Sequence, residues 1–258
     1  MPKNDRNFDN IADHFARKIY GGLKGEIRLG VLWRDLNEQV LRNIPKGASV
    51  LDAGTGLGQI ASGLANQSYE VTASDISAEM LALAKQRAEG EGSVGKIRWL
   101  QTALQLLHQE LSGQTFDLVM CHAVLEWLAE PQQGIAALAP LLSSTGYLSL
   151  TFYNRDALVY RNLIRGNFNK ATSNDFAGDP NSLTPPNPLT LNDVESQLAQ
   201  HGLKVIYKSG IRVFHDYVRQ PSGGNQLPDA IKDMELLHSS KESFIGLGRY
   251  IHLLCRPC

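Results

Sequence analysis

Cysteine is scarce in this chain, and long apolar runs are absent from it. Its three cysteines, Cys121, Cys255 and Cys258, are too few and odd in number for a disulfide framework, which favours a reducing cytoplasm. Cys255 and Cys258 form one C-x-x-C without a second pair, so we expect no metal site. No apolar run approaches the roughly 20 residues of a membrane-spanning helix, and MPKNDRNFDN has no signal-peptide core. We therefore expect a cytoplasmic protein without a membrane partner.

Net charge is also nearly absent, with 25 Lys and Arg against 26 Asp and Glu, while 43% of the 258 residues are apolar. That balance excludes disorder as the overall state, and the length fits one α/β domain, residues 1–258. Residues 51–150 carry four bases and ten acids, net −6, whereas the remainder carries 21 bases and 16 acids, net +5. Basic flanks suit an anionic macromolecular substrate, although ordinary surface variation gives the same pattern.

The middle of the chain alternates between strand and helix patterns. The expected strands are 48–52, 70–75, 97–101, 116–121 and 146–153. The expected helices between them are 57–66, 77–90 and 131–142. This alternation is typical of a parallel, doubly wound sheet with helices on both faces.

The two ends of the chain depart from that alternation. Apolar residues at Ile11, Phe15 and Ile19 predict an N-terminal helical arm, which Gly21, Gly22 and Gly25 divide into two helices. After the fifth strand we expect a helix at 156–166, a Pro-rich loop at 173–190, helices at 191–201 and 227–239, and strands at 203–207 and 249–255. The predicted parts are N-terminal helices 1–45, a core 46–155, an insertion or cover 156–202, and a C-terminal part 203–258.

Residues 50–58 read VLDAGTGLG, an apolar strand that runs into a glycine-rich turn before a helix. The glycines at 54, 56 and 58 let the backbone approach a ligand closely. Their spacing differs from the G-x-G-x-x-G of dinucleotide folds. Asp52 at the strand end would repel a pyrophosphate and attract an ammonium group, so the expected ligand is cationic.

Asp75 ends the following strand, EVTASD, where its carboxylate can hold the two hydroxyls of a ribose. The glycine turn, Asp52 and Asp75 together favour S-adenosylmethionine (SAM) as the cofactor. NAD and a turn without any ligand are the weaker alternatives.

These residues resemble those of the class I SAM-dependent methyltransferase family over about residues 45–155. The resemblance implies an α/β fold, a doubly wound, Rossmann-like sheet of seven strands with an antiparallel last strand. An N-terminal helical arm and an insertion after strand 5 would complete it. It also implies that Asp52 and the glycine turn flank the methionine part of SAM and that Asp75 holds the ribose. Met80, Ala103 and Leu104 would then contact the adenine.

His122 ends the fourth strand, at the sheet edge where the methyl group would meet its acceptor. A hydrogen-bonded histidine beneath a loop is the equally simple interpretation. The sequence after that strand, CHAV, is not the Asn-Pro-Pro-Tyr of enzymes that methylate amide or exocyclic nitrogens, and no Pro-Cys loop for pyrimidine C5 is found. Amino groups and pyrimidine carbons are therefore disfavoured as acceptors.

Five further segments are not generic methyltransferase motifs: DRNFDNIADHFARKIYGGLKGEIR, HAVLEW, LTFYN, IRVFHDY and LGRYIH. Through them nearly the whole chain is similar to the bacterial tRNA 5-carboxymethoxyuridine methyltransferase family. The resemblance implies esterification of the carboxylate of 5-carboxymethoxyuridine at the wobble position, with the anticodon stem-loop of tRNA as partner. It also implies that Arg28 contacts the SAM carboxylate. The acidic, Pro-rich segment 173–190 departs from a basic RNA-gripping loop.

The expected cofactor-binding residues are Arg28, Asp52, Gly54, Thr55, Gly56, Asp75, Ile76, Met80, Ala103, Leu104 and His122. A carboxylate is already an anionic nucleophile at neutral pH, so the reaction needs no general base, and we assign no catalytic residue. The candidates that orient the acceptor are Tyr20, Tyr153, Arg212, His215 and Arg249. The expected RNA contacts are Arg161, Arg165 and Lys170.

Two other functions fit the same cofactor site. One is a SAM-dependent O-methyltransferase of a small carboxylic acid or a quinone-type phenol, which would not bind tRNA. The other is a non-catalytic SAM-binding module that serves as a partner subunit. Asp52 and Asp75 do not separate these, because all three need the cofactor.

Overall fold

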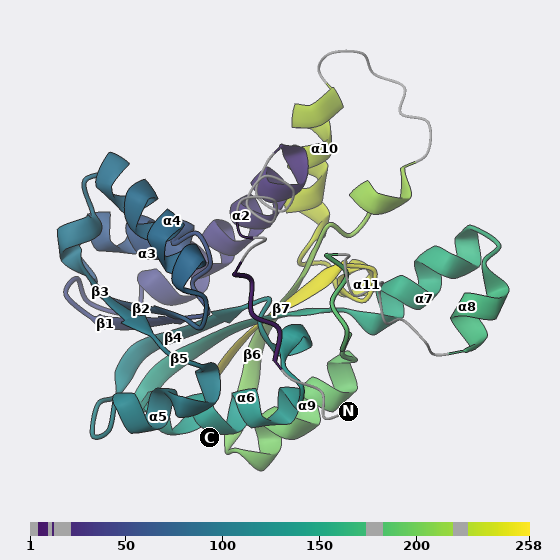
Figure 1. Ribbon diagram of the computed structural model, residues 1–258. Helices are drawn as coiled ribbons and strands as arrows, with labels where there is room; N and C mark the ends of the chain where they lie inside the picture. The colour runs from purple at the N-terminus through teal and green to yellow at the C-terminus, as the bar shows by residue number, and fades with distance from the viewer. Residues whose placement is uncertain (1–4, 10–11, 13–21, 174–182, 219–226) are drawn as a thin grey trace.

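The structure, a computed structural model, describes residues 5–9, 12, 22–173, 183–218 and 227–258 (Figure 1). Tyr20 and the apolar positions of the first expected helix, Ile11, Phe15 and Ile19, lie outside the described residues. So does most of the predicted Pro-rich loop, of which 173 and 183–190 are described.

Seven strands form one sheet in the order β3-β2-β1-β4-β5-β7-β6. They are β1 Ser49–Ala53, β2 Glu70–Asp75, β3 Ile97–Gln101, β4 Phe116–His122, β5 Leu142–Tyr153, β6 Leu203–Ile211 and β7 Tyr250–Pro257. The strands from β3 to β5 pair in parallel, and β7 runs antiparallel to both β5 and β6. The predicted doubly wound, seven-stranded sheet with an antiparallel last strand is confirmed.

Helices cover both faces of the sheet (Figure 1). The helices of the described residues are α2 Leu23–Leu36, α3 Gln59–Asn66, α4 Ala78–Gly90, α5 Leu107–Glu110, α6 Pro131–Leu138, α7 Arg155–Ile164, α8 Phe168–Thr172, α9 Leu191–Gln200, α10 Leu227–His238 and α11 Glu242–Ile245. Neighbouring strand residues point to opposite faces, so Val50 of β1 joins one core with α2 and α3. Leu51 joins the other core with α6 and α9.

Three boundaries differ from the prediction by four residues, and two of them have an identifiable reason. The helix expected to reach 142 ends at Leu138 as α6, because Pro140 follows and has no amide hydrogen to donate. Strand β6 continues past 207 to Ile211, through a Lys-Ser-Gly that reads as a turn. It does so because Gly210 packs against Gly248, where a Cβ would meet backbone atoms within 3.3 Å. β5 likewise begins at Leu142, ahead of the expected 146.

The expected insertion after β5 consists of α7, α8, the described residues 183–190 and α9. Asn154 anchors its start, since the Asn154 Oδ1 accepts from the Asp156 amide and the Nδ2 donates to the carbonyls of Gly246 and Gly248. Helices α7 and α8 lie at the end of the sheet opposite α3 and α4 (Figure 1).

Candidate active site

A cavity opens at the carboxyl ends of the parallel strands, where the strand order reverses between β1 and β4. Gly54 and Gly56 of the turn after β1 have φ angles of 76° and 57°, which favour glycine. At Gly54 a Cβ would also lie 2.3 Å from the Cγ2 of Val124. The glycine turn is therefore required both by its backbone conformation and by close packing.

This larger cavity contains about 880 Å³ of empty space when the part open to solvent is included. Eight of the predicted cofactor residues line it: Arg28, Gly54, Gly56, Asp75, Ile76, Met80, Leu104 and His122. A smaller cavity of about 390 Å³ shares Arg28, Gly54 and His122 with it and adds Asp52 and Thr55. Of the predicted residues, all of which the structure describes, Ala103 alone lines neither of these two cavities.

Asp52 is a buried carboxylate with little to stabilise its charge. Its Oδ2 accepts a 2.7 Å hydrogen bond from the Thr55 hydroxyl. Burial nevertheless raises the pKa of Asp52 to about 6, and the nearby charge of Asp75 adds to that rise. A cation bound in the smaller cavity would supply the charge that this carboxylate lacks.

Asp75 holds the turn and the following helix together. Its Oδ2 accepts from the amide of Gly56 at 3.0 Å, and its Oδ1 accepts from the amide of Ser77 at 3.0 Å. Burial raises the pKa of Asp75 although both hydrogen bonds favour the ionised form. The carboxylate therefore faces the cavity from a fixed position.

The N-terminal segment 5–9 lies across the cavity, which the sequence did not indicate. Asp5 accepts hydrogen bonds from the Gln105 side chain at 2.7 Å and from the Ala129 amide at 2.8 Å. The Arg6 amide donates to the Trp127 carbonyl at 3.0 Å, and the Ser77 hydroxyl donates to Asp9 at 2.6 Å. The larger cavity is also lined by residues that were not among the predicted site residues. Four of them, Asp5, Arg6, Phe8 and Trp127, come from the segments DRNFD and HAVLEW, which were noted in the sequence as family-specific.

Tyr250 joins this cavity to a second group of side chains, the arginine cluster, which we define as Arg161, Arg212, Asp216 and Arg249. The guanidinium carbon of Arg28 lies 4.3 Å from the Tyr250 ring centroid, and that of Arg212 lies 5.8 Å from it. Tyr250 lines the larger cavity and was missed as a site residue, although it belongs to LGRYIH. Cofactor cavity and arginine cluster are therefore neighbours.

The arginine cluster contains three guanidinium groups and one carboxylate. Arg212 Nη1 lies 3.5 Å from Asp216 Oδ1, and Arg249 Nε lies 3.3 Å from Oδ2. Burial opposes the charge of Asp216, but the His215 hydrogen bond and both arginines hold its pKa well below the usual range. Among the described residues, Arg249 Nη1 and Arg161 Nε are buried without a hydrogen-bond partner. Such donors suit an incoming anion.

The structure brings most of the predicted acceptor residues together. Tyr153 is 6% exposed, and its ring lies 5.2 Å from that of Tyr250, tilted by 59°, with the Arg249 guanidinium over it. Burial raises the pKa of Tyr153 to about 12. His215 Nδ1 lies 3.0 Å from Asp216. Tyr20 lies outside the described residues.

The three predicted RNA contacts separate. Arg161 belongs to the arginine cluster, where burial and the charge of Arg249 lower its pKa, whereas Arg165 and Lys170 are exposed. Tyr160 and Phe168 lie near them with 41% and 62% of their surfaces exposed.

Glu126 is a further buried acid that sequence reasoning missed. Among the described residues, neither of its carboxyl oxygens has a hydrogen-bond partner, and burial raises its pKa to about 7. Its position inside HAVLEW was the available signal.

Within the described residues, no helix is long and apolar enough to cross a membrane. The same part of the chain contains no group of three or more His, Cys, Asp or Glu side chains that could hold a metal ion.

The fold and the cavity are those of a class I SAM-dependent methyltransferase. A methyltransferase domain family matches residues 51–150. The magnesium protoporphyrin IX methyltransferase of Synechocystis PCC 6803, solved with bound SAH, shares the fold with a TM-score of 0.61. It is 19% identical, and the alignment covers 97% of this chain and 96% of that one.

Sequence similarity defines the family more narrowly. The tRNA 5-carboxymethoxyuridine methyltransferase of Escherichia coli (strain K12) is 37% identical over 98% of this chain and 96% of its own length. The chain belongs to the tRNA 5-carboxymethoxyuridine methyltransferase family. The ubiquinone biosynthesis O-methyltransferase of Haemophilus ducreyi is 33% identical over only 46% of this chain and 51% of its own.

Proposed function

We propose that this protein transfers the methyl group of SAM to the carboxylate of 5-carboxymethoxyuridine at the wobble position of tRNA. The product is the methyl ester, 5-methoxycarbonylmethoxyuridine. The full-length family relationship supports this assignment. In the site, the observation that carries it is the excess of buried guanidinium donors in the arginine cluster beside the cofactor cavity.

The two cavities fit the cofactor by charge. Asp52, with its raised pKa, suits the ammonium group of SAM, and Arg28 suits the carboxylate. Asp75 suits the ribose hydroxyls, while Met80 and Leu104 offer apolar surface to the adenine. Gly54, Thr55, Gly56 and Ile76 supply backbone around it, and Ala103 contributes through its position between Thr102 and Leu104.

The reaction needs no general acid or general base from the protein. The substrate carboxylate oxygen forms a bond to the methyl carbon while the carbon–sulfur bond breaks, and the electron pair remains on sulfur. Positive sulfonium and negative carboxylate charges disappear together, so the protein must orient the groups and exclude water. Arg249 and Arg212 would orient the carboxylate, and the Tyr153 phenol would donate a further hydrogen bond.

tRNA would meet the protein on the side of α7 and α8. Arg165 and Lys170 offer phosphate contacts, and the exposed rings of Tyr160 and Phe168 can stack on unpaired bases. The anticodon stem-loop must present its wobble base flipped out, because Arg249 is buried and the side chains of Arg212 and Asp216 are largely so. The proposal also includes the division of one domain into N-terminal helices, core, insertion and C-terminal part. It includes a cytoplasmic location as well.

Mass spectrometry of wobble nucleosides tests the reaction. tRNA from cells lacking this gene is incubated with the purified protein and SAM. One methyl group gained on 5-carboxymethoxyuridine is the expected result. Methylation of a small carboxylic acid or quinone-type phenol instead would support the alternative O-methyltransferase. SAM binding without any methyl transfer would support the non-catalytic module.

The variant Arg249→Gln tests the acceptor site. Removing the unpartnered Nη1 donor should raise the KM for tRNA about tenfold or more and leave the Kd for SAM unchanged. Arg256→Gln is the matched control, because Arg256 lies at the far end of β7, where its Nη2 donates to the Thr145 carbonyl. An unchanged KM in Arg249→Gln would remove Arg249 from the acceptor site.

A further inference from the structure

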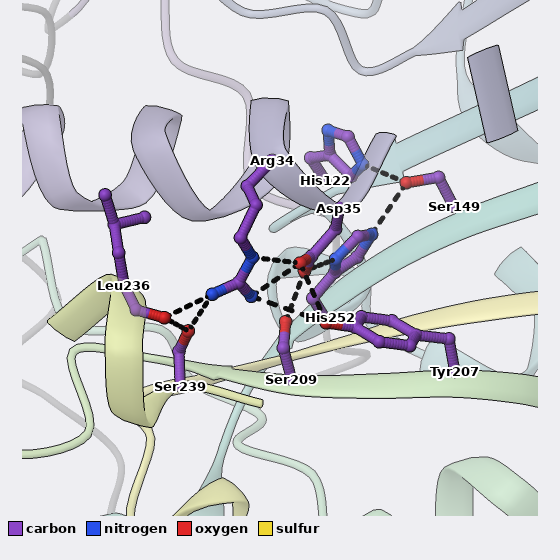
Figure 2. Close-up of polar contacts among 9 residues, drawn as sticks. All are labelled: Arg34, Asp35, His122, Ser149, Tyr207, Ser209, Leu236, Ser239 and His252. Atoms are coloured by element: carbon purple, nitrogen blue, oxygen red, sulfur yellow. Dashed lines mark hydrogen bonds and ion pairs between the residues drawn. The ribbon is translucent and has the colours of Figure 1, made fainter. Parts of the chain in front are cut away.

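His122 is one end of a hydrogen-bonded chain that leads from the cofactor cavities to a fully buried carboxylate (Figure 2). His122 Nε2 lies 2.8 Å from the Ser149 hydroxyl, which lies 2.9 Å from His252 Nε2. His252 Nδ1 lies 2.8 Å from Asp35 Oδ2. We call these four residues the relay. Ser149, His252 and Asp35 are each 0% exposed.

The sheet register explains why the relay forms. His122 on β4, Thr151 on β5 and His252 on β7 are direct partners across three strands, so their side chains share one face. Ser149 precedes Thr151 by two residues and therefore also lies on that face, between the two imidazole rings. Asp35 reaches the same face from α2. No sequence pattern predicts the relay, because its four residues lie on four different elements.

Asp35 fixes the direction of the first hydrogen bond in the relay. Its carboxylate also accepts from Arg34, Tyr207 and Ser209. Burial opposes its charge, but the His252 hydrogen bond, the Arg34 charge and the Ser209 hydrogen bond lower its pKa below the ordinary value. An ionised carboxylate only accepts, so His252 must carry its hydrogen on Nδ1.

The direction of each further hydrogen bond in the relay depends on the one before it, as far as His122 at the cavity. When the His252 ring is neutral, its Nε2 carries a lone pair and accepts from the Ser149 hydroxyl. The Ser149 oxygen then accepts from His122, which carries its hydrogen on Nε2. Burial, with the added charge of Arg28, lowers the pKa of His122 well below its usual value. His122 Nδ1, on the opposite ring edge, is left as a hydrogen-bond acceptor.

We propose that His252 is a neutral ring and that the relay therefore holds His122 as the neutral Nε2–H tautomer, so that the Nδ1 of His122 accepts a hydrogen bond from the ammonium group of SAM. His122 is the residue that contacts the cofactor, and Ser149, His252 and Asp35 are positioning residues. This rests on the proposed SAM site, in which His122 lines both cavities beside Asp52 and Arg28. The opposite tautomer would aim a donor at a cation.

The substitution Asp35→Asn inverts the relay in this scheme. Arg34 donates to Oδ1, so the amide oxygen must occupy that place and the NH₂ group must face His252 Nδ1. His252 then carries its hydrogen on Nε2, Ser149 donates to His122 Nε2, and His122 carries its hydrogen on Nδ1. A carboxylate-to-amide change on α2 therefore switches a tautomer at the end of β4.

Nitrogen-15 NMR of the imidazole rings in the cofactor-free protein measures this directly. The His122 signals are assigned by their loss in His122→Gln. The wild-type protein should show the Nε2–H tautomer and Asp35→Asn the Nδ1–H tautomer. Asp35→Asn combined with Ser149→Ala should not switch, because the link is cut. Asp35→Asn with Thr151→Val, the matched control on the same face of β5, should still switch.

Calorimetric titration with SAM gives the second readout. Asp35→Asn should weaken SAM binding about tenfold or more, since an acceptor for a charged group becomes a donor. A wild-type Nδ1–H tautomer overturns the proposal even if no variant folds. An unswitched His122 in Asp35→Asn, or a switch without loss of SAM affinity, also overturns it. A switch together with absent tRNA methylation would reject the proposed acceptor and leave the relay standing.

Discussion

Asp52 lies beneath the glycine turn with 4% of its surface exposed and the Thr55 hydroxyl as a hydrogen-bond donor. Its carboxylate is therefore under-solvated in the cofactor-free protein, which is why its pKa rises to about 6. Holding a charge in such a place destabilises the folded protein and at the same time prepares it for a cation. A binding residue of this kind exchanges stability for affinity.

Asp52→Asn should stabilise the cofactor-free protein at pH 7. The pKa of Asp52 in the folded protein, about 6, lies above the ordinary value of 3.8. The acid therefore contributes most stability at low pH and loses it as the pH rises through about 6. Removing the charge should therefore add about 1–3 kcal/mol, seen as a melting temperature higher by roughly 2–6 °C. Scanning calorimetry without SAM measures this, and a lower melting temperature would contradict it.

The affinity for SAM should fall as the pH falls through about 6, because protonated Asp52 no longer attracts the ammonium group. By linkage, binding at pH 5 should be about tenfold weaker than at pH 7. The raised pKa of Asp75 acts in the same direction. Titration calorimetry between pH 5 and 8 measures the profile, which should flatten in Asp52→Asn. An equally steep profile in that variant would assign the effect to another group.

One side chain of a neighbouring helix, Glu235 of α10, stabilises the turn after β6 by accepting hydrogen bonds from its backbone. Arg212 has a φ of 60°, a left-handed conformation unusual for a residue with a Cβ. Glu235, on α10 and 0% exposed, accepts from the amides of Val213, Phe214 and His215. The helix therefore fixes the backbone that places Arg212 and Asp216.

Glu235→Gln should loosen this turn. An amide offers one acceptor oxygen where the carboxylate offers two, so at least one of the three backbone donors loses its partner. We expect unfolding to become easier by about 1–3 kcal/mol and the KM for tRNA to rise, with the Kd for SAM unchanged. Denaturant unfolding and steady-state kinetics measure both.

Glu242→Gln removes the same charge from the exposed start of α11 and should change neither stability nor KM. If Glu235→Gln lowered stability but left the KM for tRNA unchanged, the turn would have no part in acceptor binding.

Charge is divided between two ends of the protein. The acidic stretch 51–150 contributes α3 to α6 and much of the sheet, while α7 and α8 carry exposed bases at the opposite end from α3 and α4 (Figure 1). An anionic polymer would be attracted to the α7–α8 end.

Arg165→Ala combined with Lys170→Ala should weaken tRNA binding and flatten its salt dependence. Each lost phosphate contact lowers the slope of log K against log salt by about 0.7 to 0.9. Binding measured at several salt concentrations tests this, with SAM affinity unchanged. Lys85→Ala combined with Arg98→Ala is the matched control, since both bases are exposed at the other end of the sheet. Equal slopes in the two double variants would exclude α7 and α8 as the RNA side.

Local patterns in the sequence were sufficient to predict most of the cofactor-binding residues and part of the sheet. The glycine turn, Asp52 and Asp75 occupy fixed positions relative to strand ends, and strand ends of a parallel sheet meet at one edge. Ten of the eleven predicted cofactor residues accordingly line the two cavities. The parallel part of the sheet, from β1 to β5, also follows from the alternation of strand and helix patterns, whereas the antiparallel last strand was implied by the family resemblance.

Other features depended on contacts between residues far apart in the chain. The segment 5–9 crosses the cavity through Asp5 and Arg6, and the relay joins Asp35 to His252 across 217 positions. The arginine cluster likewise needs the turn after β6 to meet α7 and the start of β7. Sequence patterns report the surroundings of neighbouring residues, because periodicity and turn chemistry are local. Which distant side chains share a hydrogen bond is decided only when strand register and helix packing bring them within about 3 Å of one another.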